Sequence, residues 1–350
     1  MAVAPGPDGP GAPPRLRRWA IETTDRLDRV SWPERRRLAA LPADLAHYEE
    51  LLLGLPLFGK IEARLPPDLL LTPPDRLRVG FVCLGPRADL AGIGRLLDRS
   101  GLDVLLVPEV DVGMSRSGNL HEAAVLADSL DMGYAFAVEA LALPGDDPDD
   151  RSVGAADLYG LLGTAMLFRP TLQALGGLRV DMSGRWFQAA AERRLGGTVA
   201  LFARIGLGHE FVTLTTVALD PALPMQERRQ QVLSLLERLD AHDPLSPALV
   251  ALDPGGDDLF QDLGSFAERP RIARLALSLG RLDPLLGAFL KRGFSWASGH
   301  LSAGARSAPR SGVFFARKLR CEAARVVPAV DASGNRFARS DLAVVEIGLP

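Results

Sequence analysis

Short β-rich runs recur through most of this 350-residue chain, and their number limits the folds that it can adopt. The first run, at 78–84, is rich in β-branched and aromatic residues, as strands are. Further strands are expected at 103–107, 134–139, 163–168, 197–204, 210–217, 247–252, 311–317, 322–328 and 341–347. Helices, in which Leu and Ala recur every three or four residues, are expected at 88–100, 119–131, 224–240 and 270–291. So many strands with so few helices exceed one doubly wound sheet, whereas two packed sheets with helices outside accommodate them.

The N-terminal part of the chain has a different texture. Residues 1–14 are dominated by Pro and Gly, so we expect a disordered tail there. From residue 15 to about 54 the pattern is helical, with Trp19, Leu27 and Val30 on one side. Next to them, Ser31-Trp32-Pro33-Glu34 reads as a capping box, in which Glu34 reaches back to the helix start.

Paired prolines at 66–67 and 73–74 indicate a linker after these helices. The expected division is therefore a tail at 1–14, a helical segment with a Pro-rich linker at 15–76, and one main domain at 77–350. Arginine is in excess over acidic residues at 15–37, which favours a solvated helix face and leaves recruitment of a partner as the alternative.

Composition narrows the class of protein. The chain is 47% hydrophobic and 24% charged, as globular proteins are. Forty basic and 43 acidic residues give a formal charge of −3, which argues against nucleic acid as the partner. Two cysteines, Cys83 and Cys321, cannot build a disulfide framework or a paired CxxC metal site. With neither a secretory apolar core nor a run of about 18 apolar residues, we expect a cytoplasmic protein without a membrane segment.

The stretch LDVLLVPEVDVGMSRSGN at 102–119 is the most informative for function. Its strand carries Glu109 near the end, and the loop that follows carries Asp111, Arg116 and Asn119. A carboxylate at a strand end is a natural ligand for Mg²⁺, which takes oxygen ligands and often only one or two carboxylates from a protein. A solvated glutamate is the alternative, and the residues alone leave both open.

These residues resemble a known family. The order of Glu109-Val110-Asp111, then LADSLDMGYAFAVE, GLLGTAMLFR, VTLTTVALD and VVPAVDASGNRFARSDLAVVEI is similar to bacterial members of the endonuclease/exonuclease/phosphatase superfamily, which have the DNase I-like fold. The resemblance covers about residues 77–350. It implies a four-layered α/β/β/α sandwich, here with an N-terminal helical extension, and, for active members, Mg²⁺-dependent hydrolysis of phosphoesters.

Active members of that family hold the metal with a glutamate and an asparagine, while an Asp-x-Asn pair and two histidines orient the phosphate and activate water. Carried over one by one, three carboxylates persist in this chain. The metal-binding glutamate falls on Glu109, the aspartate of the Asp-x-Asn pair on Asp253, and the aspartate of the terminal Ser-Asp-His on Asp341. The resemblance thus implies that Glu109 is a metal ligand and that Asp253 and Asp341 are catalytic residues.

The other family positions carry different residues. Both histidines are replaced, one by Ala218 and one by Leu342. The three amides are replaced by Cys83, Thr164 and Gly255. Leucine cannot accept a proton, and losing a positioned acid or base typically costs about 10²–10⁴ in rate. The replacement of both histidines and all three amides argues against ordinary family hydrolysis.

Two hypotheses follow. The first is a pseudoenzyme that keeps the sandwich and binds a small molecule or a protein partner through the former phosphoesterase cleft. The second is an enzyme, with Mg²⁺ as the cofactor if it has any, whose active site is rebuilt around Glu109, Asp253 and Asp341. Asp257, Asp258 and His300 are further candidates for such a rebuilt site.

Overall fold

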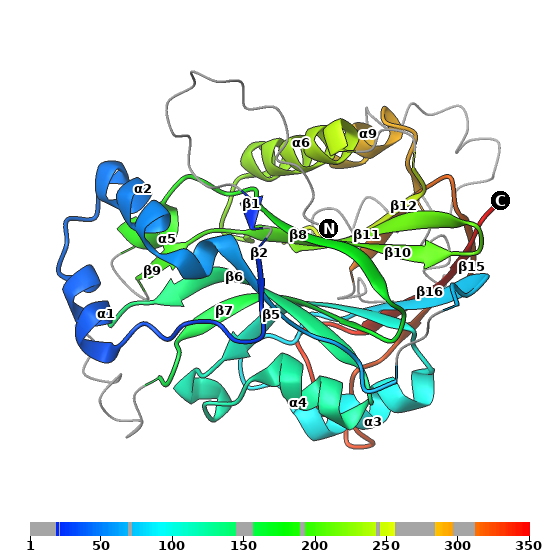
Figure 1. Cartoon of the computed structure of the whole chain (residues 1–350), viewed down its shortest axis with the longest axis horizontal. Helices are drawn as coiled ribbons and strands as arrows, with labels where there is room; N and C mark the ends of the chain where they lie inside the picture. The colour runs from blue at the N-terminus through cyan, green and yellow to red at the C-terminus, as the bar shows by residue number, and fades with distance from the viewer. Residues whose placement is uncertain are drawn as a thin grey trace.

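The computed structural model describes residues 19–20, 22–68, 72–144, 157–189, 193–242, 246–255, 284–296 and 312–350. Within these residues, two β-sheets pack face to face and helices cover both outer sides (Figure 1). This arrangement is the four-layered α/β/β/α sandwich expected from the excess of strands over helices, and the predicted fold class is confirmed.

The first sheet has seven strands among the described residues. Its order is β1 (Trp19–Ala20), β8 (Leu172–Arg179), β10 (Val199–Leu207), β11 (Glu210–Ala218), β12 (Ala248–Asp253), β14 (Val313–Arg317) and β13 (Ser295–Trp296). β11 and β12 run parallel, so their carboxyl ends lie side by side at one edge.

The second sheet has nine strands in the same part of the chain. Its order is β15 (Arg320–Val327), β16 (Leu342–Gly348), β4 (Arg76–Phe81), β5 (Val104–Val112), β7 (Leu161–Phe168), β6 (Gly133–Ala142), β3 (Lys60–Arg64) and β2 (Glu22–Thr24), with β9 (Arg194–Gly196) also paired to β6. β4 and β5 are parallel neighbours, which brings their carboxyl ends together as well.

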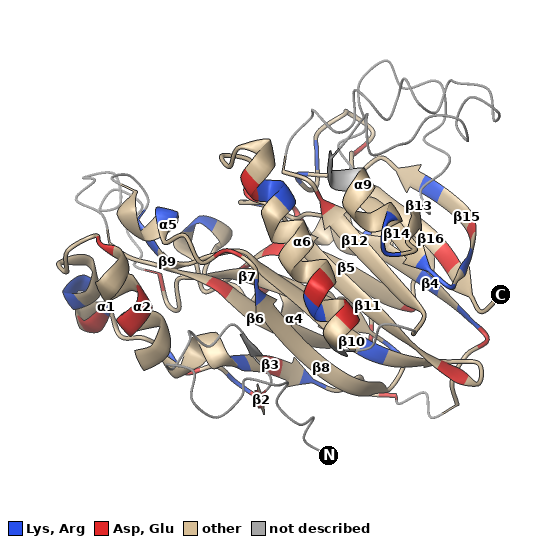
Figure 2. Cartoon of the chain, turned by 90° about the horizontal axis from the view of Figure 1, so that it is seen from above, with Lys and Arg blue, Asp and Glu red and all other residues tan. Residues whose placement is uncertain are grey.

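Helices lie on both outer faces. Below the nine-stranded sheet are α3 (Leu90–Ser100) and α4 (Glu122–Ser129), and above the seven-stranded sheet are α6 (Met225–His242) and α9 (Pro284–Leu290) (Figure 1). Near one end of the sandwich are α1 (Trp32–Ala39), α2 (Leu45–Gly54) and α5 (Arg185–Gln188), and short 3₁₀ turns occur at Pro56–Gly59 and Ser115–Ser117. Basic and acidic positions are interspersed along α6 and the strands beside it (Figure 2), in keeping with the near-neutral total charge.

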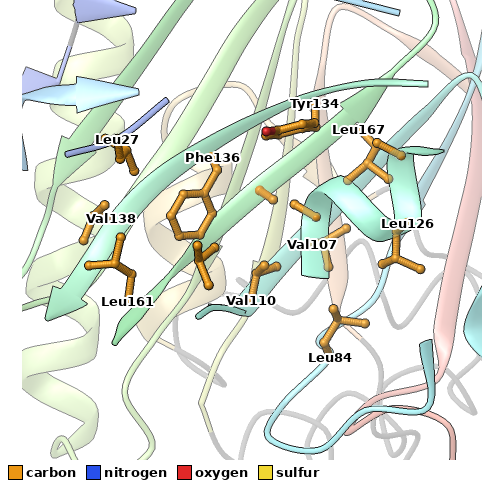
Figure 3. Packing of buried hydrophobic residues seen from close by; sticks show 14 of the residues in the cluster. Leu27, Leu84, Val107, Val110, Leu126, Tyr134, Phe136, Val138, Leu161 and Leu167 are labelled. Atoms are coloured by element: carbon orange, nitrogen blue, oxygen red, sulfur yellow. The ribbon is translucent and has the colours of Figure 1, made fainter. Parts of the chain in front are cut away.

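Three hydrophobic clusters fill the spaces between the four layers. The middle cluster, between the sheets, includes Phe81, Leu106 and Leu214. A second cluster joins the seven-stranded sheet to α6 and α9. The third lies between the nine-stranded sheet and the helices below it, where Leu126 of α4 gathers with Val107 and Leu167 of the strands (Figure 3). Successive side chains of a strand point to opposite faces of its sheet, and hydrophobic burial on both faces therefore stabilises each sheet.

The ten predicted strands are all present within a few residues of the expected bounds. Three of the four predicted helices are present, as α3, α4 and α6. The fourth, predicted at 270–291, is described only from residue 284 onward, as α9, because residues 270–283 lie outside the described residues. The short strands β1, β2, β3, β9 and β13 and the longer β8 were not expected. β8 has the sequence LQALGGLR, in which two glycines and one alanine weaken the strand pattern.

The helical interpretation of the N-terminal segment is wrong for its first part. Trp19 lies in β1, which pairs with β8, and Glu22–Thr24 form β2, which pairs with β3 next to β6. Residues before 77 thus extend both sheets rather than forming a purely helical addition. Only half of the capping box forms: Ser31 Oγ accepts from Glu34 N at 3.4 Å, while the Glu34 carboxylate pairs with Arg37.

No helix among the described residues is long and apolar enough to cross a membrane.

Candidate functional site

A bulge in β5 positions Glu109. The pairing of β5 with β7 shifts register between Val107 and Val110, and Glu109 within this bulge has φ of +60°. A non-glycine residue in the left-handed region costs roughly 1–2 kcal/mol, and such backbone outliers cluster at functional sites. The bulge re-aims one side chain of a mostly apolar strand, so that the Glu109 carboxylate meets the end of the other sheet.

Arg339, which lies in the turn before β16, contacts both Glu109 and the end of the other sheet. Its Nε atom lies 2.6 Å from Glu109 Oε2, and its Nη2 donates to Asp253 Oδ2 at the end of β12. The Glu109 contact is an ion pair without hydrogen-bond geometry, because neither atom of that pair has a hydrogen-bond partner. One guanidinium therefore joins two carboxylates that come from different sheets.

Cys83 completes this group. It lies two residues after the end of β4, is fully buried, and its Sγ donates to Asp253 Oδ2 at 3.1 Å. The hydroxyl of Ser340 accepts from Cys83 N at 2.8 Å, and Ser340 N donates back to Cys83 O, so the turn that carries Arg339 is fastened to the end of β4. We call Cys83, Glu109, Asp253 and Arg339 the Arg339 cluster.

Burial and charge shift the acid–base properties of the cluster. Burial raises the pKa of Glu109 to about 7, while the Arg339 charge opposes the shift and Asp253 adds to it. Burial, followed by the charges of Asp253 and Glu109, raises the pKa of the Cys83 thiol well above its usual range. Burial also disfavours the Arg339 cation, but its acidic neighbours outweigh that cost and raise its pKa. The cluster therefore holds a permanent cation and a neutral thiol.

Asp111 lies within β5 rather than in the loop after it, and that loop folds back onto its carboxylate. Arg116 donates to both carboxylate oxygens of Asp111, at 2.8 and 2.7 Å, and Ser117 Oγ donates to the same group. The Asn119 side chain accepts from Leu158 N at 2.9 Å, which joins this loop to the residues just before β7. The Asp111 carboxylate is thus bound by Arg116 and Ser117 of the loop that follows β5.

Thr164 and Ala218, where the resemblance implies an amide and a histidine, lie in opposite sheets: Thr164 lies opposite the bulge in β5, and Ala218 lies beside Asp253. Thr164 is buried and its Oγ1 donates to Glu139 Oε1 at 2.8 Å. Burial raises the pKa of Glu139 to about 7, and the charge of Glu109 contributes to this shift. Ala218 lies directly beside Asp253 in the β11–β12 register, so a methyl group occupies the position next to that carboxylate.

Gly255 makes the turn that follows Asp253. Its φ is +69°, a Cβ there would lie 2.3 Å from Leu219 O, and its N–H donates to Asp253 Oδ1 at 2.9 Å. Glycine is required by this close approach and by the positive φ. The turn also fixes the orientation of the Asp253 carboxylate.

Asp341 and Leu342 are placed elsewhere. Asp341 Oδ1 accepts from Ala329 N at 3.1 Å and from Arg336 Nη2 at 2.8 Å, so it stabilises the turn before β16. Leu342 is fully buried in the hydrophobic cluster against α3 and α4. The structure brings Glu109 and Asp253 together, and it gives Asp341 a different set of partners.

The residues present do not fit a hard divalent cation in this arrangement. Both candidate carboxylates, Glu109 and Asp253, contact the Arg339 cation, and the third neighbour is a protonated thiol, a poor ligand for Mg²⁺. In the part of the chain that the structure describes, no group of three or more His, Cys, Asp or Glu side chains is placed to hold a metal ion. Asp257, Asp258 and His300 lie outside the described residues.

Arg339 is the residue that sequence reasoning missed. It stands two positions before Asp341, inside the FARSDL stretch used for the resemblance, but it is one of many arginines in a chain with 40 basic residues. Its place two residues before Asp341, a carboxylate expected in the site, was the one feature of the sequence that pointed to it. Only the fold, which brings Glu109 and Asp253 together, distinguishes Arg339 from the other arginines.

Comparisons with known proteins agree with this fold. No protein-family model and no curated protein matches the sequence. Among solved structures, the endonuclease/exonuclease/phosphatase from Beutenbergia cavernae DSM 12333 is similar, with 15% identity and a TM-score of 0.52 over 79% of this chain and 72% of that one. The endonuclease/exonuclease/phosphatase from Bacteroides vulgatus has 10% identity and a TM-score of 0.51, over 79% of this chain and 99% of that one.

An endonuclease/exonuclease/phosphatase family protein from Bacteroides thetaiotaomicron has 11% identity and a TM-score of 0.50, over 80% of this chain and 100% of that one. Identities at this level show a shared fold. The chain has the DNase I-like fold of the endonuclease/exonuclease/phosphatase proteins, as the resemblance in its sequence predicted.

Proposed function

We propose that this protein is a pseudoenzyme with the DNase I-like fold, which binds a small molecule or a protein partner at the end of the sandwich around the Arg339 cluster and does not hydrolyse phosphoesters. The observation that carries this proposal is the pairing of Ala218 with Asp253. Where the family resemblance implies a histidine next to the aspartate, the neighbouring strand supplies a methyl group, which neither transfers a proton nor stabilises a developing negative charge.

The other neighbours of Asp253 do not replace that histidine. The Cys83 thiol is buried and its pKa is raised, so it stays protonated and donates to Asp253. A buried thiol of this kind is inert rather than nucleophilic. Leu342, the second replaced position, is packed in the core and has no ionisable group. Each lost proton-transfer group typically costs about 10²–10⁴ in rate, although such losses need not add.

The competing hypothesis is a hydrolase with a rebuilt site, and one observation favours it: the fold does bring Glu109 and Asp253 to one guanidinium. That hypothesis requires Arg339 to leave both carboxylates before a cation can bind them. Since the turn that carries Arg339 is hydrogen-bonded to the end of β4, the arrangement favours the binding role.

The test is turnover of a generic aryl phosphodiester and an aryl phosphomonoester by the purified full chain with Mg²⁺. We expect the wild-type rate to equal that of the Glu109→Ala variant. Mg²⁺-dependent hydrolysis that disappears in Glu109→Ala would refute the proposal. Native mass spectrometry of the purified protein tests the binding role directly, since a bound small molecule or protein adds its own mass.

A further inference from the structure

The cation between Glu109 and Asp253 belongs to the chain itself. Glu109 comes from the nine-stranded sheet and Asp253 from the seven-stranded sheet, and Arg339 contacts both. These three side chains are only 24%, 16% and 36% exposed, in the order Glu109, Asp253 and Arg339. Two partly buried carboxylates need a positive charge close by, and here the guanidinium supplies it.

The backbone places Arg339 at this point before its side chain makes any contact. Arg339 N donates to Leu84 O at 2.8 Å, and Ser340 N donates to Cys83 O at 3.2 Å. Gly85, with φ of +70°, lies so close that a Cβ there would be 2.8 Å from Arg339 Cβ. The segment after β4 is therefore shaped to let this arginine approach, which makes the ion pairs a built feature of the fold.

The contact with Glu109 is one of charge rather than of directed hydrogen bonding. Arg339 Nε and Glu109 Oε2 are 2.6 Å apart, yet both atoms are buried without a hydrogen-bond partner. Arginine normally pairs with a carboxylate through aligned, bidentate N–H donors, as Arg116 does with Asp111 in the adjacent loop. Glu109 also keeps its left-handed backbone conformation in the bulge. The Glu109 carboxylate is thus held by the bulge where it meets a positive charge.

We infer that Arg339 is a built-in cation that closes a cryptic divalent-cation site formed by Glu109 and Asp253. This inference rests on the proposed function, because it gives the reason why the two remaining carboxylates do not take up Mg²⁺. An external ion must displace a tethered group whose effective concentration is on the order of 1 mM or more. Removal of the guanidinium charge leaves two carboxylates facing one gap, which are the oxygen ligands that Mg²⁺ and Mn²⁺ prefer.

The experiment is isothermal titration of the full chain with Mn²⁺ and with Mg²⁺. We expect Arg339→Gln to bind Mn²⁺ at least tenfold more tightly than the wild type, and the double variant Arg339→Gln/Glu109→Gln to lose that gain. Arg336→Gln is the matched control, because Arg336 is similarly exposed at 34% and pairs with Asp341 in the same turn. It should bind Mn²⁺ as the wild type does. Equal Mn²⁺ affinity in the wild type and Arg339→Gln would overturn the inference.

Thermal unfolding with and without Mn²⁺ provides a second measurement. Mn²⁺ should raise the Tm of Arg339→Gln and leave that of the wild type unchanged, since an ion stabilises a protein only when it binds the folded state. Arg339→Lys keeps a positive charge and should exclude Mn²⁺ as the wild type does. An Arg339→Lys variant that binds Mn²⁺ like Arg339→Gln, or an Arg339→Gln chain that stays unfolded in Mn²⁺, would contradict the inference.

The two proposals fail in different ways. Phosphoester hydrolysis by the wild type refutes the pseudoenzyme function, whatever the titrations show. Equal Mn²⁺ binding by wild type and Arg339→Gln refutes the built-in cation, whatever the hydrolysis assay shows.

Discussion

The buried carboxyl of Glu139 offers the sharpest test of the electrostatics between the sheets. Its side chain is fully buried in β6, and Oε1 accepts from Thr164 Oγ1 at 2.8 Å and from Val199 N at 3.4 Å. Burial raises the pKa of this group from 4.5 to about 7. The difference corresponds to about 3 kcal/mol of preference for the neutral form in the folded state.

The sign of the pH dependence follows from linkage. Below pH 4.5 the carboxyl is protonated in the folded and unfolded chains alike, so it makes no difference to the free energy of unfolding. As the pH rises from 4.5 to about 7, the unfolded chain releases this proton while the folded protein keeps it, so the folded protein loses stability, and above about 7 the loss is complete. Glu139→Gln is neutral at every pH and keeps the oxygen that accepts from Thr164. It should therefore match the wild type near pH 4.5 and exceed its free energy of unfolding by up to about 3 kcal/mol at pH 8.

Urea-induced unfolding at a series of pH values, followed by circular dichroism, measures this difference. Glu210→Gln is the control, because Glu210 is an exposed carboxylate at the start of β11 and its replacement should change stability by at most about 0.5 kcal/mol. If Glu139→Gln and the wild type differ by the same amount at every pH, the reasoning about the buried carboxyl is wrong.

Two further substitutions test the packing around the site. Leu342→His restores a family residue type at a fully buried position in the core against α3 and α4; it should lower the free energy of unfolding by about 2–4 kcal/mol and give no hydrolysis, and a stable or active variant would show that position 342 faces the site. Arg179→Met removes a buried guanidinium that donates to the carbonyls of Val138, Glu139 and Gly197; it should cost about 3 kcal/mol or more by urea unfolding, and an unchanged stability would mean that these carbonyls find other donors.

The strands of the sandwich were predictable because their signal is local. Runs such as the one in β5 are short and apolar enough to be buried on both faces of a sheet, which favours a strand over a helix. β1 and β2 were missed because two or three residues carry no periodicity, and Trp19 enters a strand only through its pairing with Leu178 of β8. Long-range pairing of this kind overrides local propensity.

The candidate site was predictable in part for the same reason. Glu109 and Asp253 stand at strand ends, and the parallel pairs β4–β5 and β11–β12 bring such ends together. Asp341 was expected with them, but its carboxylate is used by Arg336 and Ala329 in the turn before β16. Neighbouring backbone donors compete for a carboxylate, and sequence order does not show which of them succeeds.

The sequence by itself determined the two packed sheets of this protein, since the apolar runs are written in it directly, and it carries Ala218 and Leu342 where the resemblance implies histidine. Only the tertiary structure decided which charge the two remaining carboxylates face. Arg339 lies 230 positions from Glu109 and 86 from Asp253, and the three side chains meet because the turn before β16 is hydrogen-bonded to the end of β4. Electrostatic contacts depend on distance in space, and folding alone sets that distance.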